Sequence, residues 1–222
     1  MYHFSYFKEN DKQALLQFMK DYPFAFLTGS YLSGEPVATQ IPVLLEEREG
    51  ELYLQGHIMR KTDHHKAFIE NPKALLVFTG PHCYVSASWY SKPGTASTWN
   101  YMSIHVRGDI RFMEDQELIA FMKKLTLTYE KENLQSPTIY DNLPTSFLDK
   151  MMPAIVGFEI KAASIDNVFK LSQNRDEASY LNIIDKLEAE GGDSTAIARE
   201  MRKRKDSLFP AGVEWDASKF SS

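Results

Sequence analysis

The sequence predicts a mainly β fold with added helices, an α+β protein in which a small antiparallel barrel is followed by a helical tail. Short apolar and β-branched runs recur with tight polar turns between them, which is typical of antiparallel sheets and barrels. No G-x-G-x-x-G motif follows a strand, so a doubly wound dinucleotide-binding sheet is not expected. Helical periodicity is concentrated in a few inserts and in the tail after residue 173.

The first half of the chain is expected to hold two short helices and most of the strands. An amphipathic helix over residues 11–22 ends at Pro23, which breaks helices. A second short helix over residues 62–72 begins at Thr62 or Asp63, either of which can cap it. Strands are expected over residues 24–32, 36–46, 51–57, 73–80, 83–90 and 98–115.

The second half is expected to hold four helices and a further strand segment. A long helix runs from about Asp115 to Glu132, and a short helix over residues 145–152 has Ser146 and Asp149 placed as a capping box. Residues 154–172 return to strand, and two helices follow over residues 176–189 and 194–205. We therefore expect a barrel domain over residues 1–172 and a helical extension over residues 173–222, packed on the barrel or on a partner chain.

The bulk composition excludes several classes of protein. The 222 residues carry a net charge of -5, so nucleic-acid binding would need a local basic patch. Cys83 is the single cysteine, which excludes an internal disulfide and a zinc cluster of cysteines. The histidines lack the spacing of a metal site, so no metal is expected. The chain starts without a signal-peptide pattern and has no membrane-spanning apolar run, so a cytoplasmic protein is expected.

Six basic side chains gather where the third strand is expected to meet a helix, in a segment that we call the charged junction (residues 56–66). They are His57, Arg60, Lys61, His64, His65 and Lys66. Phosphate groups are bound by such donors, and a helix N-terminus adds amide N–H groups and a favourable dipole. A solvated charged loop would have the same composition.

Two further clusters have both a binding and a packing interpretation. Aromatic residues between positions 80 and 101 could stack on a planar ligand or fill a core; they are Tyr84, Trp89, Tyr90, Trp99 and Tyr101. Gln173 and Asn174 could bind the edge of a base-like ring. Alternatively, Ser172, Asn174 or Asp176 caps the helix that follows.

The last predicted helix ends in a basic run. Its cations are Arg199, Arg202, Lys203, Arg204 and Lys205. Two helices joined by a Gly-rich turn can form a DNA-reading helix-turn-helix. Positive charge in a last helical turn also simply complements the helix dipole, and the preceding helix is acidic. Direct contact with DNA therefore has weak support in the sequence.

The strand expected over residues 98–115 alternates between an apolar and a polar face from Met102 onward. Met102, Ile104, Val106, Ile110 and Phe112 form the apolar face, which we expect to line the barrel interior. Tyr101, Ser103, His105, Arg107, Asp109 and Arg111 form the other face. This polar face could be solvated or could meet a partner chain.

Seven segments together resemble the PaiB-like family, described as FMN-binding negative transcriptional regulators. They are FAFLTG, PVATQIPVLL, GHIMR, GPHCYVSASWY, TWNYMSIHVRGDIRFMED, IVGFEI and FKLSQNR, in this order over nearly the whole chain. The chain departs from the family at Gln40, where a histidine is typical. Cys83, Ala87 and Ser97 stand where Ala, Pro and Pro are typical.

The resemblance implies an antiparallel split β-barrel that forms a homodimer and binds FMN in a groove between the two chains. It makes Arg60 and Lys61 the best phosphate donors and places His57 and Ile58 beside the ribityl chain or ring. His64, Trp99, Asn100 and Gln173 are further residues expected to contact the cofactor. Tyr101, His105 and Arg107 are expected at the interface or groove.

The resemblance favours a flavin-linked regulatory role, exerted through DNA contact or indirectly. The alternative is a flavin-dependent oxidoreductase acting on a small molecule, in which the cofactor carries the chemistry and no catalytic side chain is needed. A third hypothesis keeps the split-barrel dimer and its groove but gives the groove another anionic ligand.

Overall fold

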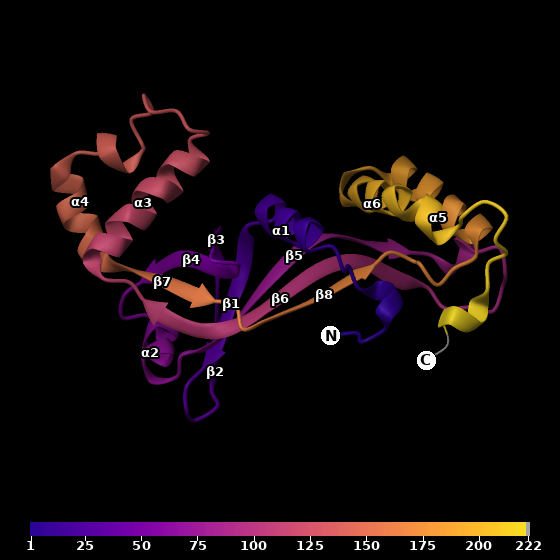
Figure 1. Cartoon of the computed structure of the whole chain (residues 1–222), viewed down its shortest axis with the longest axis horizontal. Helices are drawn as coiled ribbons and strands as arrows, with labels where there is room; N and C mark the ends of the chain where they lie inside the picture. The colour runs from indigo at the N-terminus through magenta and orange to yellow at the C-terminus, as the bar shows by residue number, and fades with distance from the viewer. Residues whose placement is uncertain (221–222) are drawn as a thin grey trace. The chain divides into compact units, whose positions relative to one another are not determined.

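The computed structural model describes residues 1–220 of the 222-residue chain, and within them eight strands form one sheet. The strand order is β2-β1-β5-β6-β7-β4-β3, and β8 pairs with β6 (Figure 1). The strands are β1 (Phe24–Ser30), β2 (Pro36–Pro42), β3 (Leu44–Arg48), β4 (Glu51–Met59), β5 (Lys73–Val85), β6 (Thr98–Phe112), β7 (Ile155–Lys161) and β8 (Ser164–Lys170). The pairs β1–β2, β1–β5, β3–β4, β4–β7 and β6–β7 are antiparallel. The predicted α+β class with an antiparallel barrel-type sheet is confirmed.

Six α-helices lie within the described residues. They are α1 (Lys12–Asp21), α2 (Asp63–Glu70), α3 (Asp115–Tyr129), α4 (Thr145–Met151), α5 (Glu177–Glu190) and α6 (Gly192–Leu208). No helix among residues 1–220 is both long enough and apolar enough to cross a bilayer.

The chain divides into two compact units, each built from separate segments. The barrel unit comprises residues 19–78 and 105–165, and the terminal unit comprises residues 1–18, 79–104 and 166–222. The helical tail thus shares a unit with the amino terminus and with the middle of the chain. The predicted division at residue 172 stays a prediction.

The core of the barrel unit follows the alternation that the sequence shows. In β4 every second residue is buried, including Leu54 and Ile58, and β6 buries Val106 and Ile110 as predicted. Gly56 is required by this packing. A Cβ atom at Gly56 would lie 2.6 Å from the ring of Phe158, so any larger residue there would push the ring out of the core.

Two strand predictions were wrong at their boundaries. The segment 36–46 forms two strands with different partners, since β2 pairs with β1 and β3 with β4, and the Val43 N–H between them donates to the Pro23 carbonyl. Conversely, Gly80 and Pro81 look like a turn but lie inside one continuous strand, β5. The burial alternation of β5 shifts by one residue at Thr79 and Gly80, which accommodates the proline without ending the strand.

The predicted capping box at Ser146 and Asp149 was also wrong. The residue that precedes α4 is Pro144, which offers no side-chain acceptor. A capping box does occur at α3, where Glu114 accepts from the third residue of the helix and Glu117 accepts from the Glu114 N–H at 2.9 Å. The predicted strand 154–172 is the pair β7 and β8, with the chain turning at Ala162 and Ala163.

In the terminal unit, α5 and α6 lie side by side (Figure 1). Their contact buries Tyr180, Ile183, Ile197 and Met201 completely. The Tyr180 hydroxyl donates to the Met201 carbonyl at 2.9 Å, so the buried phenol is satisfied. The two helices therefore form a fixed hairpin with its own core.

Candidate functional site

The charged junction lies where β4 ends and α2 begins, as the sequence predicts. Lys61 makes the turn with a φ of 67°, a left-handed conformation that is uncommon outside glycine. The Thr62 side chain caps α2 by accepting from the His65 N–H, and its hydroxyl donates to the Met59 carbonyl at 2.9 Å. Hydrogen bonds of Thr62 thus fix both ends of the turn that carries these basic residues.

Arg60 is the best-anchored cation of the junction. Its backbone N–H donates to the Ala154 carbonyl at 2.9 Å, and its side-chain Nε donates to the Ile155 carbonyl at 2.8 Å. It lines a cleft of about 560 Å³ whose other walls come from α3, α4 and the turns beside them, including Leu118 and Tyr140. A guanidinium held by Nε keeps its two terminal amines for a ligand.

The helix N-terminus is less available than the sequence suggests. The His64 N–H donates to the Asp63 carboxylate at 2.7 Å, and the His65 N–H donates to the Thr62 hydroxyl at 3.4 Å. Hydrogen bonds from His64 lower the pKa of Asp63, which keeps this exposed carboxylate charged at neutral pH. An anion at the junction would therefore be bound by side chains rather than by free backbone amides.

The histidines of the junction have different surroundings. His57 lies on β4 with its ring centroid 6.1 Å from that of Phe121, and burial lowers its pKa. Its Nδ1 is buried and has no hydrogen-bond partner within residues 1–220. His65 Nδ1 accepts from the Lys61 N–H at 2.9 Å, which gives His65 a structural role, and His64 contacts the Thr62 hydroxyl at 3.0 Å.

The junction has the chemistry that a phosphorylated cofactor requires. Arg60 and Lys61 supply charged donors, and the buried Nδ1 of His57 is a polar atom in need of a partner. Ile58 is only 3% exposed and its side chain points into the core, so only its backbone could reach a ligand. These residues fit FMN, and their contact with it stays a prediction.

The other predicted cofactor residues lie in the terminal unit. Trp99 is 54% exposed, with the rings of His82 and Tyr84 at 6.0 Å and 6.1 Å, so its face is open for stacking. Asn100, by contrast, is fully buried. Its side-chain oxygen accepts from the Ser172 hydroxyl at 3.0 Å.

Gln173 is also buried, and its side chain forms hydrogen bonds with the backbone of its own segment. Its side-chain oxygen accepts from the Leu171 N–H at 2.7 Å, and its nitrogen donates to the Phe169 carbonyl at 2.5 Å. The structure thus gives Asn100 and Gln173 packing roles, and their predicted cofactor contacts remain untested. Of the proposed caps for the next helix, Asp176 is the one used, since it accepts from the Ser179 N–H.

The polar face of β6 is neither uniformly solvated nor uniformly buried. Arg107 is exposed, Tyr101 and His105 are half-buried, and Ser103 is buried. The predicted interface role of Tyr101, His105 and Arg107 therefore stays a prediction.

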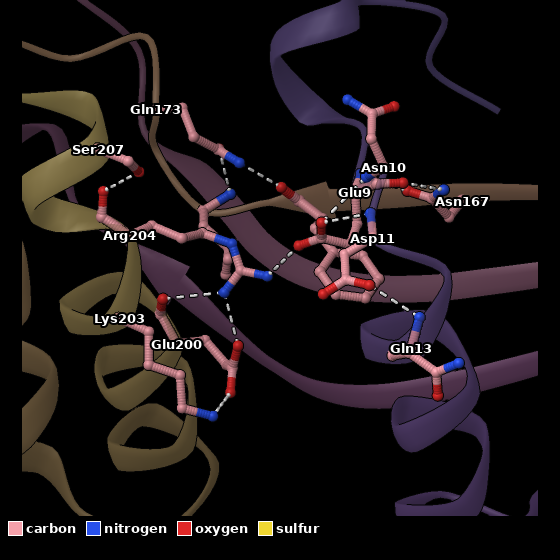
Figure 2. A network of polar contacts seen from close by, with 12 residues as sticks. Glu9, Asn10, Asp11, Gln13, Asn167, Gln173, Glu200, Lys203, Arg204 and Ser207 are labelled. Carbon is pink, nitrogen blue, oxygen red and sulfur yellow. Dashed lines mark hydrogen bonds and ion pairs between the residues drawn. The ribbon is translucent and has the colours of Figure 1, made fainter.

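The basic run of α6 is largely neutralised within the terminal unit. Arg202 pairs with Glu188 and Asp185 of α5, and Lys203 pairs with Glu200. Arg204 lies between Glu200 and Glu9, at 2.6 Å and 2.8 Å (Figure 2). These ion pairs leave few of the tail cations for phosphate groups.

Sequence reasoning missed a charge cluster around Glu159, which is only 7% exposed. Gln55 donates to it at 3.0 Å, Arg111 approaches it at 3.3 Å, and Arg48 makes a short contact with it. The only sequence signal is an acidic residue inside the apolar segment IVGFEI. Within residues 1–220, no group of three His, Cys, Asp or Glu side chains is placed to hold a metal ion.

Comparison with known proteins identifies the family. Residues 1–164 match the family model described as "Putative FMN-binding domain". The protease synthase and sporulation protein PAI 2 of Bacillus subtilis is 31% identical over 205 residues, which cover 92% of this chain and 98% of that protein. An uncharacterized protein of Emericella nidulans is 28% identical, over 86% of this chain and 92% of its own length.

Two solved structures share the fold at 18% sequence identity. One is an FAD and heme binding protein from Mycobacterium smegmatis, with a TM-score of 0.53 over 73% of this chain and 72% of that chain. The other is a flavocytochrome from Azotobacter vinelandii, with a TM-score of 0.54 over 76% of this chain and 72% of that chain. The antiparallel split-barrel fold is thus confirmed, and the chain belongs to the "Putative FMN-binding domain" family, the PaiB-like family that its sequence motifs resemble.

Proposed function

We propose that this protein binds FMN at the charged junction and that Arg60 and Lys61 hold the phosphate. The observation that carries the proposal is the anchoring of Arg60, whose Nε is tied to the Ile155 carbonyl while the residue lines a cleft of about 560 Å³. A pre-positioned guanidinium binds phosphate without first losing side-chain freedom. The family description supports the same ligand.

The flavin, when bound, supplies the electron-transfer chemistry, and the chain holds and orients it. A polar atom of the cofactor would give the buried Nδ1 of His57 a hydrogen-bond partner.

Titration with FMN and with riboflavin tests the phosphate contact, because riboflavin has the same ring and side chain without the phosphate. FMN should bind more tightly. Each charge-assisted hydrogen bond contributes about 1.5–3 kcal/mol, so the Arg60→Ala, Lys61→Ala double variant should lose roughly a hundredfold or more in FMN affinity. Its riboflavin affinity should stay unchanged.

Lys66→Ala is the matched control, since Lys66 is an exposed cation of α2 in the same charged junction and, unlike Arg60, does not line the cleft. The phosphate assignment fails if the double variant keeps its preference for FMN over riboflavin. The flavin assignment itself fails if neither compound changes its fluorescence on mixing with the wild-type protein.

We further propose that two copies of the chain pair through the outer face of β1, β2 and β5. Phe24 and Phe26 of β1 are 55% and 38% exposed on this face. The strand register places Phe26 opposite Gln40 and Val77, and the half-exposed Val77 continues the apolar surface. Exposed aromatic side chains on a regular sheet face are typical of an interface.

We propose that the protein is regulatory, in keeping with the name of its relative, the protease synthase and sporulation protein PAI 2. The regulation is indirect, because three of the cations of α6, Arg202, Lys203 and Arg204, are paired with carboxylates of the same unit. A mobility-shift assay with the regulated promoter should show no complex at physiological salt. A specific complex that Arg199→Ala, Lys205→Ala weakens would contradict this proposal.

A further inference from the structure

A second concave site of the barrel unit lies apart from the charged junction. This groove, of about 510 Å³, runs between the start of β3 and the last turn of α3. We call it the Tyr129 groove. It shares no lining residue with the cleft at Arg60. Its volume is in the range of sites that bind small organic molecules.

The lining of the Tyr129 groove is apolar. Val43 is buried, and Leu44 and Leu45 are half-buried beside it. Tyr129 is 51% exposed, which leaves part of an aromatic ring uncovered next to these aliphatic side chains. An aromatic ring beside aliphatic groups suits a flat apolar ligand.

Lysines surround this apolar surface. Lys124 has a carboxylate neighbour, Glu46, at 3.4 Å. Lys20 and Lys131 also line the groove, and within residues 1–220 no carboxylate lies at ion-pair distance from either. The chain as a whole carries a net charge of -5, whereas these two lysines without a paired carboxylate make the rim of the groove positive.

The position of Lys131 is fixed by the way α3 ends. Lys131 and Glu132 have φ values of 53° and 60°, and the Glu132 N–H donates to the Leu127 carbonyl at 3.0 Å. The nearby Glu130 accepts from the Ser136 hydroxyl at 2.7 Å and so has a hydrogen-bond partner of its own. The left-handed turn therefore holds the Lys131 backbone at the groove.

From this arrangement we propose that the Tyr129 groove binds a small organic acid with a flat apolar body. The body lies on Leu44, Leu45 and Tyr129, and the carboxylate is held by Lys20 and Lys131. Such a ligand would be a second input to a flavin-binding protein, at a site that does not overlap the phosphate contacts of Arg60.

Calorimetric titration of the full-length protein with 2-naphthoate and with neutral 2-naphthylmethanol tests the proposal, because the two probes share their ring system. The acid should bind at least about tenfold more tightly than the alcohol at low salt, and the difference should shrink at high salt. The Lys20→Gln, Lys131→Gln variant should bind both probes with the affinity that the wild-type protein has for the alcohol. Tyr129→Ala should weaken both.

Lys92→Gln, Lys186→Gln is the matched control, because it removes two exposed lysines that do not line the groove. It should retain the wild-type affinity for the acid, and circular dichroism should show that every variant is folded. Equal affinity for acid and alcohol would overturn the proposal, as would equal losses in the two lysine variants. Loss of naphthoate binding in Arg60→Ala, Lys61→Ala would place the acid in the flavin site instead.

Discussion

At the scale of single residues, the charged junction could be predicted because its members are consecutive in the sequence. The cap at Thr62 and the strand-to-helix turn follow from local chemistry, and both are observed. The cluster at Glu159 could not be predicted, since its partner Arg48 lies 111 residues away. The hydrogen-bond partner of Asn100 is also distant in sequence, because Ser172 is 72 positions further along the chain. Sequence spacing does not reveal which polar residues will be buried together.

His57 links the junction to a pH dependence that can be measured. Burial lowers the pKa of His57 below its ordinary value of 6.5. Just below pH 6.5, His57 is therefore protonated in the unfolded chain but still largely neutral in the folded chain. The neutral His57 therefore causes no loss of stability above about pH 6.5. Below that pH, the free energy of unfolding falls as the pH drops toward the lowered pKa of His57. Carboxylates have ordinary pKa values near 4, well below that of histidine. The test therefore uses a window of about two units, from about pH 5.5 to about pH 7.5, in which histidine protonation dominates.

Thermal unfolding of His57→Gln at several pH values checks this expectation. The wild-type melting temperature should fall by roughly 1–3 °C more than that of the variant between pH 7.5 and pH 5.5. Some dependence should remain, because burial also lowers the pKa of His65. His82→Gln, at an exposed position, should behave like the wild type. Identical slopes for the wild type and His57→Gln would show that His57 is not the group involved.

At the scale of elements, periodicity located the strands but not their ends. The alternation of β6 was visible because one face is apolar throughout. The division at Val43 was hidden, since PVATQIPVLLE is apolar on both sides of the break. The continuity of β5 was hidden by Gly80 and Pro81, which usually end strands. Whether a glycine or proline ends a strand depends on tertiary packing rather than on the local sequence.

One half-buried cation, Arg204, connects α6 to the amino-terminal segment. Arg204 has only 20% of its side chain exposed and contacts both Glu9 and Glu200 (Figure 2). Its guanidinium also lies 5.4 Å from the ring of Phe169. Arg204→Ala would leave two carboxylates facing each other, so it should lower the free energy of unfolding by about 1–3 kcal/mol.

Arg202→Ala is the comparison on the same helix, with 48% of its side chain exposed. Exposed ion pairs contribute little, so this variant should lose less than about 1 kcal/mol. Chemical denaturation of the two variants measures the difference. Equal losses would mean that the burial of Arg204 does not matter and that α6 is held by its apolar contacts with α5 alone.

At the scale of the whole molecule, the fold was accessible because seven motifs of one family occur in order along the chain. Its division into units was not, because each unit combines segments distant in sequence. Nor does a sequence show which apolar side chains remain exposed after folding. Phe24 and Phe26 are large apolar residues of β1, yet their side chains face outward while Ala25 and Leu27 are buried.

This outward face leads to the prediction on assembly. In a symmetric dimer each substitution occurs twice, so Phe26→Glu removes two aromatic contacts and places two charges at the interface. Burial of one phenylalanine is worth about 1.5–3 kcal/mol, and the dimer dissociation constant should therefore rise at least about a hundredfold. Sedimentation velocity should show a dimer for the wild type and a monomer for Phe26→Glu.

Leu32→Glu provides the control, because Leu32 is 72% exposed but follows the end of β1 rather than lying on its outer face. It should remain dimeric. If the flavin groove needs both copies, the monomeric Phe26→Glu protein should also lose FMN while keeping its fold and its melting transition. A wild-type protein that sediments as a monomer would refute the pairing, whereas a monomeric Phe26→Glu protein that still binds FMN would locate the whole flavin site within one chain.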